Sequence, residues 1–274
     1  MCWIVGRPDV LSKGTRATML DRIAVISDVH GNVTALRAVL ADIEARGISR
    51  VVNLGDVVGK GPRGSEAVQL SREACEVTVR GNWDAFIARD TAPQFEVARW
   101  TRNELSDADL AWLAALPGTC EFLISGRRVR LFHASQTSEF VRVRVRHSDE
   151  EFRGMFTNTD FTGAFRAGHP ADASVVPDVV GYGDIHSAYL KAAEGLTLFN
   201  VGGTGNPLDG PSAPYVILEG VAGSPEPAPF SVNFARVAYD IQAEISVARE
   251  LLMPEADAYA RELLDGVYRG RAAS

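Results

Sequence analysis

The chain has few cysteines and no excess of positive charge, and each of these shortages excludes a class of protein. Its 274 residues include three cysteines, Cys2, Cys75 and Cys120, which lie far apart and form no CxxC motif. That number and spacing fit neither a disulfide framework nor a thiolate zinc site. The sequence therefore predicts a protein of a reducing compartment, the cytoplasm.

Membrane proteins and proteins that coat nucleic acid are also disfavoured. No hydrophobic run approaches the roughly 18 residues that a membrane span needs. The chain has 28 Lys and Arg residues against 35 Asp and Glu residues, which gives a net charge of −7. This balance argues against an extended nucleic-acid surface. A small phosphoester or nucleotide substrate remains compatible with it, because bound metal ions reverse the local charge.

The domain organisation predicted from composition is simple. Residues 1–20 lack the apolar core of a signal peptide and are predicted to form a loose N-terminal leader, with Met19 rather than Met1 as a candidate for the natural start. Residues 21–274 show no repeat, low-complexity segment or linker, and are predicted to form a single domain. Helices predicted at about residues 238–268 would pack on a sheet face or form a dimer contact, so a homo-oligomer stays open.

Residues 23–32 carry the most informative pattern in the chain. Residues 23–26 are apolar and predict a strand buried on both faces. Asp28 and His30 follow at once, and then Gly31. In an extended chain these two side chains would point to the same side and form half of a metal site. A turn with an incidental histidine is the alternative that this stretch alone leaves open.

The same pattern returns later in the chain. A helix predicted over residues 33–46, with Asn32 as N-cap and Gly47 just beyond its end, links two strands into a parallel crossover. The carboxyl ends of such strands lie at one edge of a sheet, where α/β proteins place their ligands. Polar residues follow four later strands: Asp56 after residues 51–54, Asn82 after 76–79, His133 after 129–132, and Asp184 and His186 after 178–180.

These side chains supply oxygen and imidazole ligands without a thiolate. Such a mixture suits Mn²⁺, Fe or Zn²⁺. Their number exceeds what one tetrahedral ion needs, so two divalent ions that share a carboxylate are predicted, with manganese preferred and iron, zinc or nickel as alternatives. Two ions about 3.5–4 Å apart are an established device for phosphoester hydrolysis. The predicted metal ligands are Asp28, His30, Asp56, Asn82, His133, Asp184 and His186.

The ordered motifs Asp-x-His-Gly-Asn, Gly-Asp, Gly-Asn, His and a final Gly-x-x-His-type loop resemble the calcineurin-like metallophosphoesterases, most closely their small bacterial phosphodiesterase and phosphatase branch. The resemblance spans about residues 23–218. It implies an α/β (α+β) fold, a four-layer αββα sandwich of two mixed β-sheets flanked by helices. It also implies that the turn at residues 200–205 supports the site.

The resemblance further implies catalytic roles and a mechanism. Asp28, His30, Asp56 and His186 would hold the first metal ion. Asp56 would bridge to the second ion, which Asn82 and His133 would also hold. The nucleophile would be a metal-bound hydroxide, and no covalent enzyme intermediate would form.

Two residues depart from the family pattern. Trp83 stands where many relatives have a histidine that is proposed to protonate the leaving group, and Asp184 replaces the first histidine of Gly-His-x-His. The first departure favours phosphodiesters, such as a cyclic nucleotide, as substrates. The alternatives are a phosphomonoesterase, including a Ser/Thr protein phosphatase, and a degenerate non-catalytic member that binds a nucleotide or a partner. Asp184 is predicted to bind the second ion, with a capping role in its loop as the alternative.

Residues 135–177 show the weakest pattern and are predicted to set substrate choice. Within them Arg142, Arg144 and Arg146 alternate with valines, which indicates either a strand with one basic face or, preferably, a solvated edge. His147 and His169 are predicted to lie at the surface or behind the site. Arg63, near the second motif, is either a phosphate contact or a solvated side chain.

Overall fold

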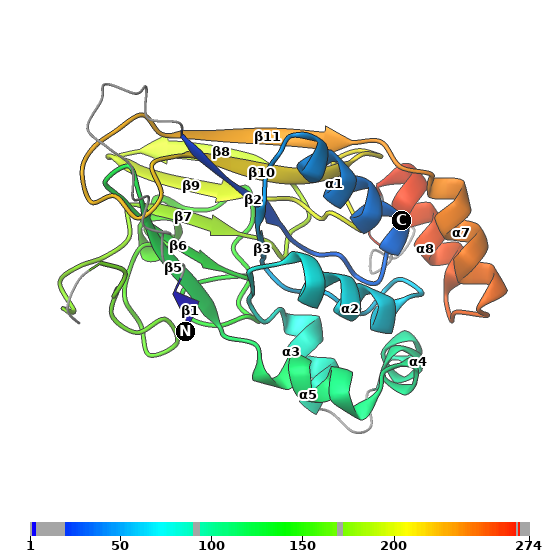
Figure 1. Cartoon of the computed structure of the whole chain (residues 1–274). Helices are drawn as coiled ribbons and strands as arrows, with labels where there is room; N and C mark the ends of the chain where they lie inside the picture. Colours follow the sequence, from blue (N-terminus) through cyan, green and yellow to red (C-terminus); the bar gives the residue numbers. More distant parts are fainter. Residues whose placement is uncertain (1, 4–19, 90–93, 169–171, 267, 269–274) are drawn as a thin grey trace.

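The computed structural model has two mixed β-sheets with helices on the outside (Figure 1). It describes residues 2–3, 20–89, 94–168, 172–266 and 268. The α/β sandwich predicted from the sequence is confirmed. The predicted leader falls mostly on residues 4–19, which lie outside the described residues, while Cys2 and Trp3 pair in parallel with the strand that contains Cys120.

Five of the described strands form the first sheet, in the order β11-β10-β2-β3-β4. The parallel strands β2, β3 and β4 occupy one side, and β10 pairs antiparallel with both β2 and β11. This arrangement brings the carboxyl ends of β2, β3 and β4 to one edge. The bounds are β2 (Asp21–Ile26), β3 (Arg50–Asn53), β4 (Val77–Thr78), β10 (Ala213–Gly220) and β11 (Ser231–Val237).

The second sheet has the order β1-β5-β6-β7-β9-β8 among the described strands. Strands β6, β7 and β9 run parallel, whereas the hairpin β5–β6 and the pair β8–β9 are antiparallel. The bounds are β1 (Cys2–Trp3), β5 (Thr119–Ile124), β6 (Arg127–Phe132), β7 (Val179–Tyr182), β8 (Tyr189–Ala193) and β9 (Leu196–Asn200).

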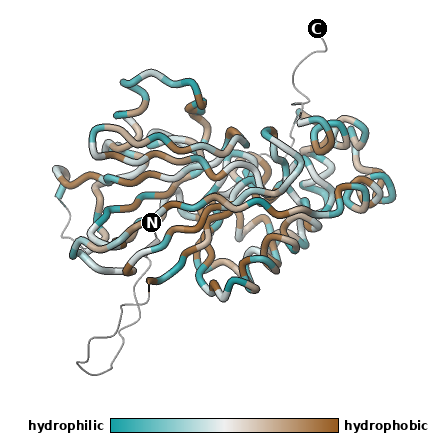
Figure 2. Tube along the Cα trace, turned by 90° about the horizontal axis from the view of Figure 1, so that it is seen from above, coloured by the Kyte–Doolittle hydropathy of each residue, from teal (hydrophilic) through white to brown (hydrophobic). Residues whose placement is uncertain are grey.

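Strand β2 is buried on both faces, as its apolar run predicted. Ile23 and Val25 pack in the core between the two sheets, whereas Ala24 and Ile26 pack against the helices on the outer face. The alternation follows from the two-residue period of a strand. Figure 2 shows the hydrophobic colour gathered in the strands and the hydrophilic colour on the outer loops and the outer sides of the helices.

Helices cover the outer face and one end of the first sheet (Figure 1). Asn32 caps α1 by accepting a hydrogen bond from the Ala35 N–H, and Gly47 follows in the left-handed conformation, as predicted. The C-terminal segment forms two helices, of which α7 packs on α1. The bounds are α1 (Val33–Ala45), α2 (Gly64–Ala74), α3 (Asn82–Arg89), α4 (Glu96–Glu104), α5 (Asp107–Ala115), α7 (Ile241–Glu250) and α8 (Ala256–Asp265).

The outer face of the second sheet is covered by one short helix, α6 (Asp149–Gly154), and by irregular chain. Arg130 fixes part of this cover from β6. Its buried guanidinium pairs with Glu121 at 2.7 Å and donates to the Thr157 and Gly163 carbonyls. A buried ion pair is tolerated when its remaining hydrogen bonds are satisfied, so this network fastens the loop to the sheet.

Residues 141–146 form neither a strand nor the edge of one. The alternation of arginine and valine was therefore misleading, because Val143 is buried through its contacts with the second sheet while Val141 and Val145 are exposed. Periodicity over so few residues cannot separate a strand from an irregular segment that has one anchoring side chain.

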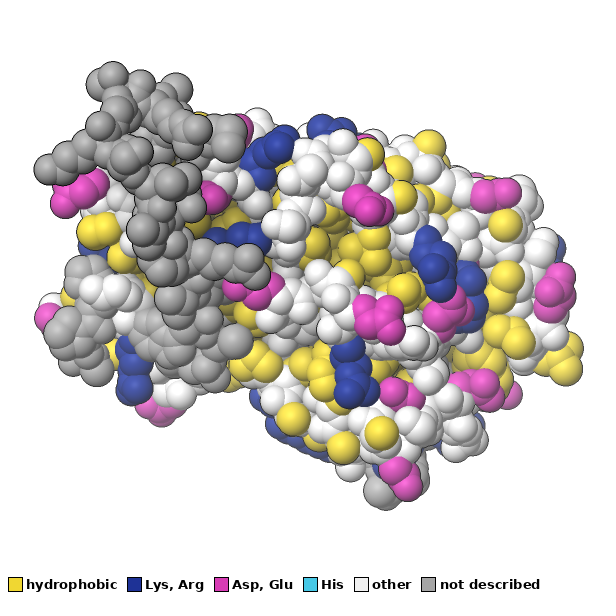
Figure 3. Space-filling view, in the orientation of Figure 1, with side chains coloured by type: hydrophobic (Ala, Val, Ile, Leu, Met, Phe, Trp, Pro, Cys, Tyr) yellow, Lys and Arg dark blue, Asp and Glu magenta, His cyan; other side chains and the backbone are white. Residues whose placement is uncertain are grey.

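The surface shows charges of both signs side by side. On the face drawn in Figure 3, Lys and Arg side chains alternate with Asp and Glu side chains instead of gathering by sign. Within the described part of the chain, no helix has the length and apolar character needed to cross a membrane.

Candidate metal centre

The backbone of most of the predicted ligands has an unusual conformation. Five of the seven predicted ligands are non-glycine residues with a left-handed φ: Asp28 (53°), His30 (50°), Asp56 (52°), Asp184 (63°) and His186 (56°). This conformation costs on the order of 1 kcal/mol or more per residue, and it persists where surrounding contacts enforce it. The expectation that Asp28 and His30 lie in extended chain is therefore wrong, although their side chains do face the same point.

Hydrogen bonds between the loops that follow the strands hold this backbone in place. Beyond the end of β2, the Asp28 N–H donates to the Gly55 carbonyl at 2.9 Å, and the His30 N–H donates to the Asp56 carbonyl at 2.8 Å. The Gly205 N–H in the turn after β9 donates to the Asp28 carbonyl at 3.0 Å. The first two motifs and the predicted supporting turn are thus fastened to one another. These contacts stabilise a loop geometry that isolated chain would not adopt.

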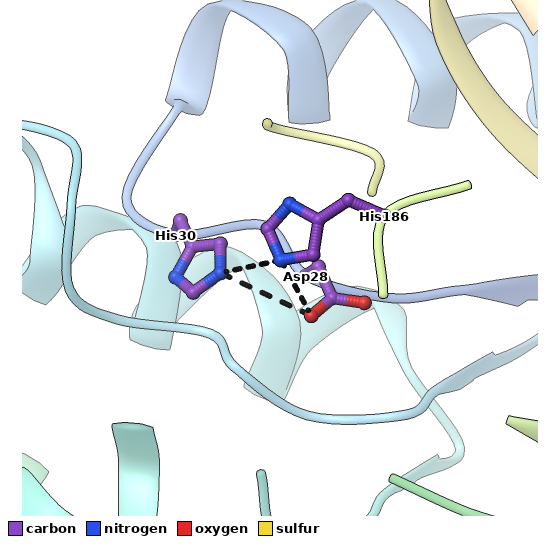
Figure 4. Close-up of side chains that lie close together, drawn as sticks. All are labelled: Asp28, His30 and His186. Atoms are coloured by element: carbon purple, nitrogen blue, oxygen red, sulfur yellow. Dashed lines mark hydrogen bonds and ion pairs between the residues drawn. The ribbon is translucent and has the colours of Figure 1, made fainter. Parts of the chain in front are cut away.

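A first cluster consists of Asp28, His30 and His186 (Figure 4). Its side chains converge from the loop after β2 and the loop after β7. The His186 Nε2 atom lies 3.2 Å from Asp28 Oδ1 and 3.2 Å from His30 Nε2, and His30 Nε2 lies 3.9 Å from Asp28 Oδ1. All three side chains are buried. Three ligand atoms therefore surround one point.

Backbone carbonyl groups determine which ring nitrogen of each predicted histidine ligand faces the candidate metal centre. A carbonyl oxygen only accepts, so the Nδ1 atom that contacts it carries the proton, and the Nε2 atom of the neutral ring is left with a lone pair. Two such lone pairs at 3.2 Å repel each other unless a cation lies between them. The Nδ1 contacts are His30 to Val58 O (3.2 Å), His133 to Leu54 O (2.8 Å) and His186 to Asn206 O (2.5 Å).

A second cluster consists of Asp28, Asp56 and His133. Asp56 points one oxygen to each side of the centre, since its Oδ2 atom lies 3.5 Å from His30 Nε2 and its Oδ1 atom 3.5 Å from His133 Nε2. Asp28 belongs to both clusters, so two carboxylates stand between them. The predicted bridging role of Asp56 remains a prediction, and the geometry makes Asp28 an equal candidate for it.

Asn82 and Asp184 lie together at the edge of the second cluster. The Asn82 Nδ2 atom donates to Asp184 Oδ1 at 3.2 Å, which turns the amide oxygen of Asn82 away from Asp184. Arg142 forms a two-pronged ion pair with Asp184, from Nε to Oδ2 at 2.6 Å and from the second terminal nitrogen to Oδ1 at 2.7 Å. A guanidinium thus holds the carboxylate that was predicted to bind the second ion.

The charges at the centre shift several pKa values. Burial and the positive charge of Lys60 hold the pKa of His30 well below its usual value, so its ring stays neutral. Burial alone would lower the pKa of His133, but the carboxylates of Asp56 and Asp28 outweigh it and raise that pKa well above the usual range. For Asp28, burial opposes ionisation, but His186 and the other histidines lower its pKa. The second cluster therefore carries an excess of negative charge that attracts a cation.

Asp84 is a supporting residue that the sequence motifs did not single out. Its carboxylate accepts four backbone N–H groups, from Asp56 (2.8 Å), Gly81 (2.9 Å), Val57 (2.9 Å) and Val58 (3.3 Å). Burial and the charge of Asp56 raise the pKa of Asp84 to about 7, against the lowering effect of these hydrogen bonds. The residue ties the loop of Asp56 to the loop of Asn82. The feature of the sequence that could have indicated this supporting role is its position at the end of Gly-Asn-Trp-Asp, residues 81–84.

Three buried polar atoms at the centre have no hydrogen-bond partner among the described residues. They are Asp28 Oδ1, Asn82 Oδ1 and His133 Nε2. A buried polar group without a partner costs about 1–3 kcal/mol, so a ligand or ion is the usual reason for such a group to persist. All three residues can offer a lone pair to a divalent cation, His133 once the proton on its Nε2 atom is displaced, so the residues present fit a metal site.

Arg63 does not face the centre. It donates to Thr34 Oγ1 at 2.7 Å and pairs with the buried Glu244 of α7. Neither interpretation from the sequence is correct for this residue, which joins α1 to the C-terminal helices. His147 is partly exposed and stacks on Phe152, away from the predicted ligands, and His169 lies outside the described residues.

The fold and the paired clusters define an α/β sandwich with a candidate metal centre at its strand ends, and comparison with known proteins places the chain in a family. Residues 22–222 match the calcineurin-like phosphoesterase superfamily domain, so the chain belongs to that superfamily, whose members use divalent metal ions. The resemblance seen in the motifs is therefore confirmed. The family match covers the residues that carry both clusters.

Individual relatives agree with this assignment. An uncharacterized protein of Methanocaldococcus jannaschii is 29% identical over 261 residues, which are 85% of this chain and 94% of that protein. The crystal structure of a metallophosphoesterase from Sphaerobacter thermophilus superposes with a TM-score of 0.68 at 27% identity, covering 90% of this chain and 100% of that one. A hypothetical protein from Pyrococcus horikoshii shares the fold, with a TM-score of 0.70 at 17% identity over 90% of this chain and 98% of that one.

Proposed function

We propose that this protein is a metal-dependent phosphoesterase that hydrolyses phosphodiesters, of which a cyclic nucleotide is one example. The observation that supports this most directly is the convergence of two ligand clusters on a shared Asp28 carboxylate. Two adjacent cation sites fit the chemistry of phosphoester hydrolysis better than that of a purely structural site. The proposed metal is manganese, with iron, zinc or nickel as alternatives.

The first ion would be held by Asp28, His30, Asp56 and His186, and the second by Asp56, Asn82 and His133. When bound, divalent ions supply a water of lowered pKa and positive charge for the phosphoryl oxygens. The chain itself orients these ligands. Each histidine is fixed by a carbonyl at Nδ1, and Asp28 is fixed at Oδ2 by the Ser27 hydroxyl at 2.7 Å and the Asp184 N–H at 3.1 Å. Such supporting contacts typically change metal affinity or activity by about 10- to 100-fold.

Asp184 remains a proposed ligand of the second ion, in competition with Arg142. If it binds the ion, the carboxylate shares its oxygens between the guanidinium and the ion, which its four lone pairs allow. If it stays paired, Arg142 remains as a fixed positive charge beside the second cluster, where it suits phosphate oxygens. Both arrangements retain a cation at this edge of the centre.

The preference for diesters rests on Trp83. Its ring lies edge-on to the ring of His30 at 5.9 Å and fills the space above Gly59, where an added Cβ atom would lie 2.3 Å from the indole. An indole nitrogen can donate a hydrogen bond but is not an acid at neutral pH. A substrate whose leaving group departs without protonation by residue 83 is therefore favoured.

A second candidate function is nucleotide or partner binding without hydrolysis. The ion pair between Arg142 and Asp184 favours it, because an internal guanidinium occupies one predicted ligand of the second ion. A phosphomonoesterase, including a protein phosphatase, is the remaining alternative within the superfamily.

Metal analysis combined with hydrolysis of an aryl phosphodiester and an aryl phosphomonoester separates these functions. We expect two equivalents of bound metal and diester hydrolysis that is lost in Asp56→Asn. Hydrolysis of the monoester alone would favour a phosphatase. If the protein neither binds metal nor hydrolyses either compound with Mn²⁺ added, the remaining candidate function is nucleotide or partner binding without hydrolysis. Glu104→Ala, at an exposed position near the end of α4, is the control variant.

A further inference from the structure

A cleft lined by aromatic side chains opens beside the metal centre. It has a volume of about 470 Å³, and Asn82 and Arg142 form the side next to the predicted ligands. Five aromatic residues form most of the remaining wall, and we call this surface the aromatic cleft: Trp83, Phe86, Phe95, Phe140 and Tyr268. Pockets for small molecules are of this size and are mostly apolar with a few polar groups.

The exposure of these side chains is unusual for apolar residues. Phe95 is 64% exposed, Phe140 55% and Tyr268 41%. They come from three separate segments, namely the residue before α4, the loop after β6 and the residues after α8, and all three line the same hollow. Figure 1 shows α3, α4 and α8 on the same, helical side of the molecule. Exposed apolar side chains that gather in a concave surface mark a binding site, whereas scattered ones do not.

The rings are arranged as edges and faces suited to a flat ligand. Trp83 meets Phe86 in a T-shaped contact with centroids 6.4 Å apart, and Phe86 meets Phe95 at 6.3 Å. Phe140 enters from a different segment. A planar ring placed in the cleft would therefore find both apolar faces and ring edges, the geometries that aromatic pairs prefer.

The cleft is continuous with the metal centre through three residues. Trp83 contacts the ring of His30, Asn82 and Arg142 both donate hydrogen bonds to Asp184, and the Arg142 side chain is 40% exposed. An arginine guanidinium keeps its charge in proteins, so Arg142 presents a positive charge at this boundary. A ligand in the cleft would thus have its ring among the aromatic residues and its phosphate next to a guanidinium and the metal ligands.

We propose that the aromatic cleft binds the planar ring of the substrate, which makes phosphoesters with a nucleobase or similar heteroaromatic group the substrate class of this protein. The proposal rests on the proposed function, since the phosphate of the ligand would occupy the metal centre. A fatty or sugar phosphoester would fill the cleft less well, because it lacks a flat face to stack. A second copy of this chain is the other occupant that the test addresses.

Calorimetric titration with two matched ligands tests the proposal. Adenosine monophosphate and ribose monophosphate share sugar and phosphate and differ in the base. The manganese-treated protein is titrated with each, alongside the double variant Phe95→Ala/Phe140→Ala. Stacking of one base on aromatic side chains changes affinity by about tenfold or more. We expect the adenosine compound to bind about tenfold tighter or better, and this ratio to fall to about one in the double variant.

Phe234→Ala provides the matched control, because Phe234 is 41% exposed on β11 and lines no part of the aromatic cleft. It should keep the ratio, and thermal unfolding should show all variants folded. Equal affinity for the two ligands in the unaltered protein, or an unchanged ratio in the double variant, would overturn the proposal. So would a dimer that the double substitution dissociates in sedimentation, since a second copy would then occupy the cleft.

Hydrolysis of the aryl phosphodiester, measured in the same preparations, separates this proposal from the proposed function. If the protein hydrolyses the diester but binds the adenosine and ribose compounds equally well, the aromatic cleft is not a ring site and the proposed phosphoesterase function is retained. A ratio of about ten without turnover keeps the cleft and overturns hydrolysis.

Discussion

The two ligand clusters share Asp28 but differ in their surroundings. Every residue of the first cluster has left-handed backbone, and both of its histidines are fixed through Nδ1 by carbonyl groups. In the second cluster Asp28 and Asp56 share this left-handed backbone but His133 does not, and the neighbouring Asp184 is already paired with Arg142. The first cluster is therefore preorganised for a cation, whereas the second has an internal competitor for one.

The largest effect is expected from breaking the first cluster. His186→Ala removes a ligand atom that lies 3.2 Å from both Asp28 Oδ1 and His30 Nε2. Metal ions contribute several kcal/mol of transition-state stabilisation, so kcat/KM for an aryl phosphodiester should fall by about a thousandfold. Steady-state kinetics and metal analysis check this. Retention of both activity and metal by the variant would show that the first cluster is not the catalytic one.

A loss of stability is expected from Asp84, which supports the second cluster. Asp84→Ala leaves four buried N–H groups without their acceptor, and the free energy of unfolding should fall by about 3 kcal/mol. Asp84→Asn has nearly the same shape but turns an NH₂ group toward N–H donors, so it should be destabilised nearly as much. Urea denaturation measures both. Changes below about 1 kcal/mol, comparable with Glu104→Ala, would contradict the supporting role.

Metal binding should stabilise the folded protein, and the gain from each metal equivalent should show which of the two clusters binds a metal ion more tightly. Mn²⁺ at 100 times its dissociation constant should raise the free energy of unfolding of chelator-treated protein by about 2.7 kcal/mol. Because the first cluster is better preorganised, most of this gain should appear with the first equivalent. Thermal unfolding during a titration measures it. Mg²⁺, which prefers all-oxygen ligands, serves as the control, and an equal gain from both ions would argue against binding at the histidines.

The smallest effect is expected from relieving the competition at the second cluster. Arg142→Ala removes a competing positive charge and frees the Asp184 carboxylate, so the affinity for a second Mn²⁺ equivalent should rise about tenfold, which corresponds to about 1.4 kcal/mol. Calorimetric titration of the variant gives this value. Arg144→Ala removes an exposed arginine of the same segment and should leave the affinity unchanged. A weaker second site in Arg142→Ala would instead show that the guanidinium positions Asp184 for the ion.

The sequence by itself determined the elements and the types of ligand. The apolar run of β2, the Asn32 cap, the Gly47 end of α1 and the placement of ligands after strands are all local features, set by side-chain period and backbone preference. Parallel crossovers then bring strand ends to one edge, which is why the sequence predicts that Asp28 and Asp56 lie together.

Only the tertiary structure decided how these residues are used. Arg142 and Asp184 are distant in sequence, and their pairing depends on how an irregular loop packs on the second sheet. The left-handed φ of Asp28 and His30 is enforced by hydrogen bonds that their N–H groups donate to carbonyl groups of the loop after β3, not by the preferences of those residues. The aromatic cleft likewise unites Trp83, Phe95 and Phe140 from three segments. Such contacts depend on long-range packing, which no local pattern encodes, so the sequence predicted the ligands while the fold set their partners and the surface beside them.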